Sequence, residues 1–471
     1  MLYNLAVKSL LGSKVRAISC VFSIIFIVLS MLGTIKIYIG GNLNWLIQLM
    51  LLSAAVVSSL MASPLSLVKT VRTRLSCLRS YKLMIIGWLL FMAGIAIAAL
   101  MNNGMGLYTL AKYFAFMFVL LCLLLISPLS SALLEKALSI TLIISLVPLI
   151  LLALFRQLDA LVILGDGRMG WLASWPGVIW KIGAFVWPFA VWRCLKKPNF
   201  INVLLAFGAV LVMALDGSRT SMLWLVLVWA ALATIAFFAR VHTKPIRGHI
   251  SLLVVTLLSF SLVQPVLLGW VSGHYDKLIV QLMDNHTSKQ STAATAATAA
   301  TAATAATAAT AATGLDIRNA FEETLAAPKE ATADRLVKGD NSIRLQMLQT
   351  GWQQTKDKFP WGGGFGSTRV DDFGVDSVIH MTYLQLLADE GLLSFLGYLL
   401  FILTPLYYGL RFVFEKRELF VERFESMLSP LSVLALFLFM GCFHPLSNEL
   451  TEWAIVLTAI SIVICHVSRR N

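Results

Sequence analysis

Long apolar stretches, each near the length of a membrane-spanning helix, alternate with short polar segments along most of the chain. A backbone in hydrocarbon must satisfy its own hydrogen bonds, and runs of about 20 apolar residues indicate helices rather than the strands of a barrel. The pattern predicts an all-α polytopic membrane protein with about twelve transmembrane helices. We place the spans at residues 17–39, 44–63, 83–103, 107–127, 137–155, 176–194, 199–215, 220–239, 249–270, 389–409, 429–446 and 452–468.

Basic residues mark alternate loops between these spans. Lys8, Lys14 and Arg16 precede the first span, and such residues favour the cytoplasmic side of a membrane. Every second loop again holds lysine or arginine, from Lys136 alone in one loop to four or five such residues in others, whereas the loops of opposite parity hold few of them. One missed helix would break this alternation. The N-terminus and C-terminus are therefore expected in the cytoplasm.

One long polar segment interrupts the alternation. We predict nine transmembrane helices in residues 1–270, an external loop in residues 271–380 and three further helices in residues 381–471. In the external loop, the triplet Thr-Ala-Ala repeats over residues 292–313. Its period of three does not match the helical period, and it holds no ionisable group, so we interpret the tract as a linker.

Composition agrees with the membrane assignment. Of the 471 residues, 58% are hydrophobic and 13% charged, and the mean hydropathy is +0.82. The net charge of +13 comes largely from the predicted cytoplasmic loops, where it favours anionic lipid rather than nucleic acid. The six cysteines lie outside the external loop, so no disulfide framework is expected there.

Three polar motifs fall on the predicted external side. The first is a turn at residues 216–221 that contains Ser218 and Arg219, where an ordinary helix cap is the alternative interpretation. The second is a helix-like run that contains Arg344 and ends in a cluster with Gly364 and Gly366. This cluster lacks the Lys-Ser/Thr of a phosphate-binding loop.

The third motif begins with His380 and continues through Tyr383 and Gln385 into the tenth span. Histidine titrates near neutrality and can accept a proton from a hydroxyl. Lys112 and Lys181 lie near the external ends of spans, where lysines commonly extend toward headgroups. An acidic patch of Asp371, Asp372 and Asp376 is the one weak candidate for a cation site in the external loop.

In order and spacing, the three motifs resemble those of the O-antigen ligase and polymerase family of bacterial envelope glycosyltransferases. The resemblance covers roughly residues 200–410 and implies a GT-C-like transferase without cofactor or metal. Such an enzyme moves a glycan from undecaprenyl pyrophosphate to an acceptor sugar hydroxyl, such as that of lipid A-core, outside the bacterial inner membrane. It implies that Arg219 and Arg344 bind pyrophosphate and that His380 is the base.

The chain departs from the family pattern at one position: Met381 stands where the family usually has asparagine. Within the same family, a repeat-unit polymerase for O-antigen or exopolysaccharide is the nearest alternative to a ligase, followed by a protein O-oligosaccharyltransferase. Transporters are disfavoured because they commonly have two similar halves, and this chain has a single large loop after the ninth span. A non-catalytic scaffold would not need the arginines and the histidine.

Overall fold

The protein is described here by a computed structural model. It describes residues 2–32, 41–62, 81–102, 129–155, 162–163, 169–171, 174, 177–239, 245–264, 266–267, 342–372, 375–445 and 450–468. The Thr-Ala-Ala tract, Lys112 and the predicted span at 107–127 lie outside the described residues.

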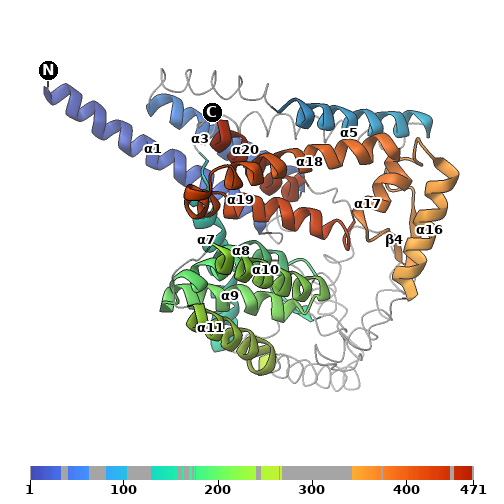
Figure 1. The fold of residues 1–471 in the computed structure, drawn as a ribbon. Coiled ribbons are helices and arrows are strands. Elements are labelled where there is room, and N and C mark those ends of the chain that lie inside the picture. Colours follow the sequence, from blue (N-terminus) through green and yellow to red (C-terminus); the bar gives the residue numbers. More distant parts are fainter. Residues whose placement is uncertain are drawn as a thin grey trace, which may run out of the picture.

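The described chain is helical apart from two short antiparallel hairpins (Figure 1). Its α-helices are α1 (Leu2–Met31), α3 (Gly41–Ala62), α5 (Lys82–Met101), α7 (Ser131–Leu154), α8 (Trp180–Lys196), α9 (Phe200–Asp216), α10 (Arg219–Phe238), α11 (Pro245–Leu257), α16 (Ser342–Lys358), α17 (Thr382–Gln385), α18 (Gly391–Phe414), α19 (Phe420–Met440) and α20 (Leu450–Ser468). Two π-helices, η3 (Leu258–Val263) and η4 (Leu386–Glu390), and a short 3₁₀ helix, η5 (Arg417–Leu419), extend or join them. The hairpins are β1 (Val162–Ile163) with β2 (Met169–Gly170), and β3 (Arg369–Asp372) with β4 (Val375–Val378).

Six of the described helical segments are long and apolar enough to cross a membrane, which makes the chain a multi-pass membrane protein. They are Lys82–Met101, Ser131–Leu152, Arg219–Phe238, Ile246–Val263, Thr382–Phe414 and Arg417–Met440. Shorter apolar helical segments occupy Ala17–Met31, Leu46–Ser59, Phe200–Asp216 and Trp453–Val467. Every predicted span except 107–127 overlaps a described helix.

Helices α5 and α18 lie side by side and antiparallel (Figure 1). Glycines allow their backbones to touch: a Cβ on Gly397 would collide with the amide nitrogen of Phe91 and lie 2.6 Å from the carbonyl oxygen of Gly87. Small residues that permit close backbone approach are a common basis of helix association in membranes. The pair brings the end of α5 close to the segment before α18.

Gly397→Val is expected to destabilise the protein by on the order of 3 kcal/mol, because the added atoms meet rigid backbone. Thermal unfolding of the purified protein in detergent measures the effect. Gly409→Val on the same helix is the matched control, since its nearest contact is the movable side-chain end of Leu431. Equal loss in both variants would contradict backbone contact as the cause.

An aromatic cluster joins α5, α18, α19 and α20. The Trp453 ring lies 5.1 Å from Phe437, 6.1 Å from Tyr398 and 6.1 Å from Phe91. All four side chains are buried. Such ring pairs add to the burial of apolar area and fix the mutual positions of the helices.

The two ends of the bundle differ in their contacts. At one end, acidic side chains pair with residues of the predicted basic loops, as in Glu135 with Arg193 at 2.5 Å and Glu425 with Lys196 at 2.5 Å. At the other end, Asn102 after α5 donates to the carbonyl of Gly362 at 3.1 Å. Each of these contacts joins helix ends that the alternation of basic loops assigns to the same side.

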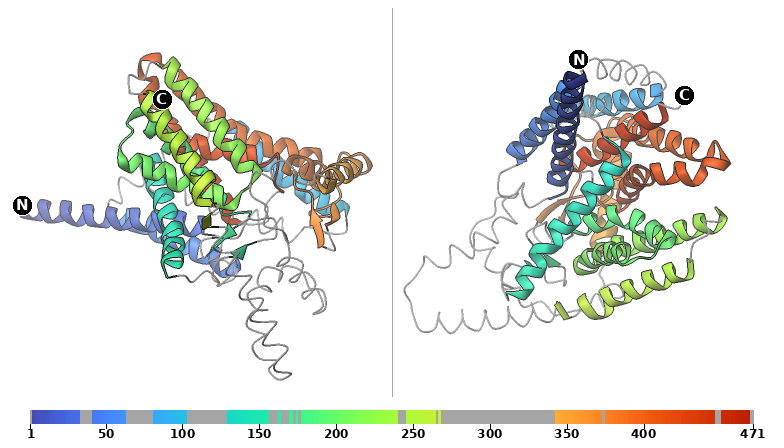
Figure 2. Two further views of the ribbon diagram at one scale, coloured as in Figure 1. Left: turned by 90° about the horizontal axis from the view of Figure 1, so that it is seen from below. Right: turned by 90° about the vertical axis from the view of Figure 1, so that its left-hand side faces the viewer.

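Helix α16 runs across the end of the bundle at which Asn102 contacts Gly362, together with α17 and β4 (Figures 1 and 2). It begins at Ser342 and ends at Lys358, just before Phe359-Pro360, as the helix-like run in the sequence predicted. The polar motifs of the C-terminal half are therefore concentrated at this end.

Candidate functional site

His380 lies beside the first turns of α16. It follows β4 and is exposed, and its Nδ1 atom is 3.3 Å from the Sδ atom of Met347. Met347 comes three residues after Arg344, so the two share one face of the helix. The structure thus brings His380 close to the helical turn that carries Arg344, although 35 residues and the β3–β4 hairpin separate them in the chain.

The contact with Met347 favours one form of the histidine ring. A thioether sulfur is a weak hydrogen-bond acceptor. If the Nδ1–H group faces Met347, the Nε2 atom carries a lone pair that can accept a proton. Met381, the next residue, packs against a small apolar cluster that includes Met347 and Leu384.

Arg219 opens α10 after a tight turn. Helix α9 ends at Asp216, Gly217 adopts the left-handed region with φ 60°, and Ser218 precedes the new helix. The carbonyl of Ser218 accepts hydrogen bonds from the amide and the hydroxyl of Ser221, at 3.0 and 2.7 Å. Arg219 is half-buried in the first turn. Ser218 is therefore part of the backbone turn that positions Arg219.

Trp180 and His444 connect this turn to the His380 motif. The carboxylate of Asp216 accepts a hydrogen bond from the amide of Gly177, whose carbonyl accepts the Trp180 indole N–H at 3.0 Å. The Trp180 and His444 rings are 5.6 Å apart.

Backbone contacts complete this connection. The carbonyl of His444 accepts hydrogen bonds from both the amide and the hydroxyl of Thr382, each at 2.8 Å. Thr382 lies two residues after His380 and opens α17. A chain of contacts thus links the turn before Arg219 to the His380 motif, and Met347 links that motif to the turn of α16 that carries Arg344.

His444 is a candidate that the sequence analysis missed. It is half-buried just beyond α19, at the same end of the bundle as His380. Its position in the motif Phe443-His444-Pro445, after a long apolar run, is the signal that could have drawn attention to it.

The glycine cluster encloses a buried carboxylate. Asp389 is fully buried in η4. Its side chain accepts hydrogen bonds from the Gly366 amide at 3.1 Å, the Ser367 hydroxyl at 3.0 Å, and the Thr368 amide and hydroxyl at 2.9 and 2.5 Å. The Gly364 amide donates to the Asp389 carbonyl at 2.7 Å.

These contacts define what Gly364 and Gly366 do in the fold. Both have positive φ, 93° and 70°, a conformation that glycine adopts without a steric penalty. Their amide groups donate to Asp389. The cluster therefore fixes η4 beneath the His380 motif instead of presenting these two N–H groups to a phosphate.

Tyr383 and Gln385 face into the protein. The Tyr383 hydroxyl donates to the carbonyl of Leu438 in α19 at 2.6 Å, and Gln385 is buried. Tyr383 thus ties α17 to the end of α19. Glu390, the residue after Asp389, is also buried, and neither of its carboxylate oxygens has a hydrogen-bond partner among the described residues.

The remaining candidates lie at the edge of this group. Lys181 is half-buried in the first turn of α8, next to Trp180. Asp371 and Asp376 are cross-strand neighbours in the β3–β4 hairpin, with Asp372 opposite Val375.

No protein-family model matches the chain, and no curated protein is similar to it.

Proposed function

We propose that the protein is an O-antigen ligase-like glycosyltransferase of GT-C-like architecture, with about twelve transmembrane helices. It transfers a glycan from undecaprenyl pyrophosphate to an acceptor sugar hydroxyl, such as that of lipid A-core. The reaction takes place at the periplasmic face of a bacterial inner membrane, and both termini are cytoplasmic. The observation that supports this best is the position of His380 beside Met347, one turn from Arg344, where helix ends meet.

The chemistry of the three residues fits such a transfer. A pyrophosphate leaving group gains negative charge as its bond to the sugar breaks, and arginine offers it a planar, permanently charged pair of donors. The positive charges of Arg219 and Arg344 stabilise the leaving group without a metal ion. His380 accepts the proton of the attacking hydroxyl. Attack from the face opposite the pyrophosphate inverts the anomeric carbon.

A repeat-unit polymerase remains the second candidate, because it uses the same donor and the same leaving group. The two differ only in the acceptor, which is a second lipid-linked glycan for the polymerase. Incubation of the purified protein with the lipid-linked donor alone distinguishes them. Longer lipid-linked glycans indicate polymerisation, whereas dependence on an added lipid A-core acceptor indicates ligation.

Replacing Arg219 or Arg344 with lysine tests the proposed function. Lysine keeps the charge but loses the planar fork, and each variant is expected to transfer on the order of tenfold more slowly or worse. The assay follows transfer from purified lipid-linked glycan. Arg411→Lys is the matched control, because Arg411 is exposed in the last turn of α18, at the opposite end of the bundle.

Parent rates in both Arg219→Lys and Arg344→Lys would contradict the pyrophosphate role of the two arginines. An equal loss in Arg411→Lys would point to a general effect on the protein rather than to the site.

A further inference from the structure

Helix α16 has three distinct faces. Met347, Gly351 and Thr355 follow each other at four-residue intervals and are buried against the protein. A Cβ on Gly351 would meet side-chain atoms of Ile379 at 2.5 Å and Leu384 at 2.8 Å. This face therefore holds the helix against the segment around His380.

One flank of α16 is apolar and exposed. Leu345, Leu348 and Trp352 recur at the i, i+3 and i+7 positions of a helical stripe. Their exposed fractions are 56%, 40% and 57%. These side chains form the apolar flank. Large apolar side chains aligned on a helix outside the core indicate a contact with something apolar.

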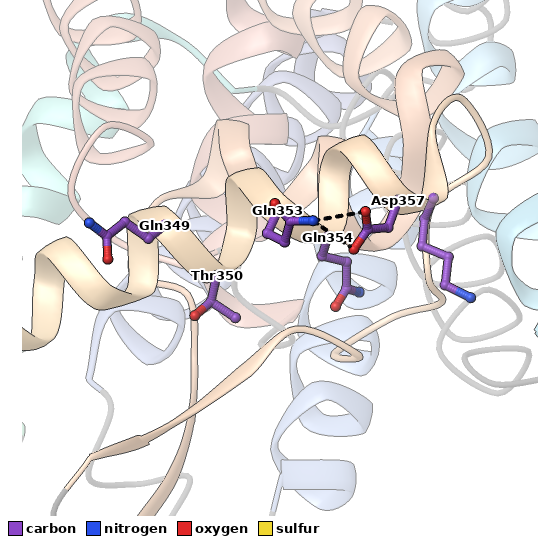
Figure 3. A pocket seen from close by; sticks show the side chains of 6 residues that line it. Gln349, Thr350, Gln353, Gln354 and Asp357 are labelled. Carbon is purple, nitrogen blue, oxygen red and sulfur yellow. Dashed lines mark hydrogen bonds between the residues drawn. The ribbon is translucent and has the colours of Figure 1, made fainter.

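The opposite flank is polar. It borders a pocket of about 520 Å³ (Figure 3). The lining residues are Gln349, Thr350, Gln353, Gln354, Asp357 and Lys358. Within it, the Gln353 amide donates to Asp357 at 2.9 Å. Amide and carboxylate groups of this kind retain their hydration best when they face water.

Exposed apolar side chains also lie at the end of α5 and in the segment that joins it to α16. Leu100 and Met101, at the end of the membrane-crossing helix α5, are 71% and 62% exposed. The side-chain amide of the next residue, Asn102, donates a hydrogen bond to the carbonyl of Gly362. Trp361 and Phe359, which lead from there back to α16, are also exposed.

We propose that α16 lies in the membrane interface, with its apolar flank among the lipid acyl chains of the leaflet in which α5 ends. Tryptophan is enriched at this depth, since its ring is apolar and its N–H group polar. Lys356, one turn beyond Trp352, is exposed and reaches toward lipid phosphates. The polar flank faces water, and Arg344 and His380 sit at headgroup level.

The inference does not depend on the proposed function, and its test uses no glycan. Leu348→Cys and Gln349→Cys are made in the full-length protein after replacement of its six cysteines. Each variant is labelled with an environment-sensitive fluorophore and reconstituted in phosphatidylcholine vesicles. Quenching is measured with a phospholipid that carries a nitroxide high on its acyl chain, and separately with iodide in the buffer.

The label at position 348 is expected to be quenched by the nitroxide lipid and protected from iodide, and the label at position 349 should behave in the opposite way. A label at Leu100 serves as the lipid-exposed reference. Leu345→Cys with Gln346→Cys provides a second pair if either first variant fails to fold.

Two outcomes would overturn the proposal. Equal iodide quenching at positions 348 and 349 would show an apolar flank open to water, as for a glycan-binding or protein-binding surface. Protection of position 348 from both quenchers would show that another part of the protein covers it.

Discussion

Asp389→Asn is expected to destabilise the protein by on the order of 2–4 kcal/mol and to remove its activity. Asparagine keeps the shape of the side chain but replaces one acceptor oxygen with an NH₂ group. The Asp389 carboxylate is the acceptor in all four of its side-chain hydrogen bonds. At least one donor would then face another donor in a fully buried site. Thermal unfolding in detergent measures the loss.

Glu390→Gln is the matched control for this prediction. Glu390 is the next residue and is also buried, but its carboxylate oxygens have no hydrogen-bond partner among the described residues. Removing its capacity for charge should leave stability unchanged or raise it, because an isolated buried carboxylate is costly. If both variants melt alike, the enclosure of Asp389 by residues 364–368 is not what holds η4.

The predicted spans other than 107–127 overlap described helices, and six described helical segments are long and apolar enough to cross a membrane. Hydropathy locates these helices because it reflects whether lipid or water surrounds a segment. The predicted and observed bounds differ where polar residues continue a helix. The sequence predicted a tenth span from residue 389, but the helical segment begins at Thr382 and passes through η4. Hydropathy is low there because of Asp389 and Glu390. Hydrogen bonds from the glycine cluster satisfy Asp389, and no pattern within the helix itself reveals them.

The eleventh predicted span shows the same effect at the other end of the bundle. It was predicted from residue 429, whereas α19 begins at Phe420. The additional turns contain Arg423 and Glu425, which pair with Glu415 at 3.0 Å and Lys196 at 2.5 Å. Charged residues usually indicate a loop between spans, but ion pairs with neighbouring segments allow this helix to continue.

The members of the candidate site could be selected by residue type, but their contacts could not. Arg344 and His380 are separated by a hairpin whose register decides which turn of α16 the histidine meets. The partner turned out to be Met347, three residues beyond Arg344. His444 was missed because a histidine just beyond an apolar run resembles an ordinary interfacial residue, and it is distinguished by its contacts with Trp180 and Thr382.

His380→Ala is expected to reduce glycan transfer by about 10²–10⁴-fold, which is the usual contribution of a positioned base. Binding of the lipid-linked donor should be retained, since pyrophosphate recognition is assigned to Arg219 and Arg344. Transfer is measured with purified donor and acceptor between pH 5.5 and 8.5, and donor binding is followed separately. The parent rate should fall as pH decreases, because protonated histidine cannot accept a proton.

His444→Ala is the matched control for His380→Ala. The carbonyl of His444, not its side chain, accepts the hydrogen bonds of Thr382, so the α17 turn should survive the substitution. Its ring contacts Trp180, and its loss should lower the rate by about tenfold at most while the pH profile is preserved. The reverse result, with His380→Ala active and His444→Ala inactive, would transfer the role of base to His444. The contact of His380 with Met347 would then indicate that this histidine packs against α16 and has no part in proton transfer.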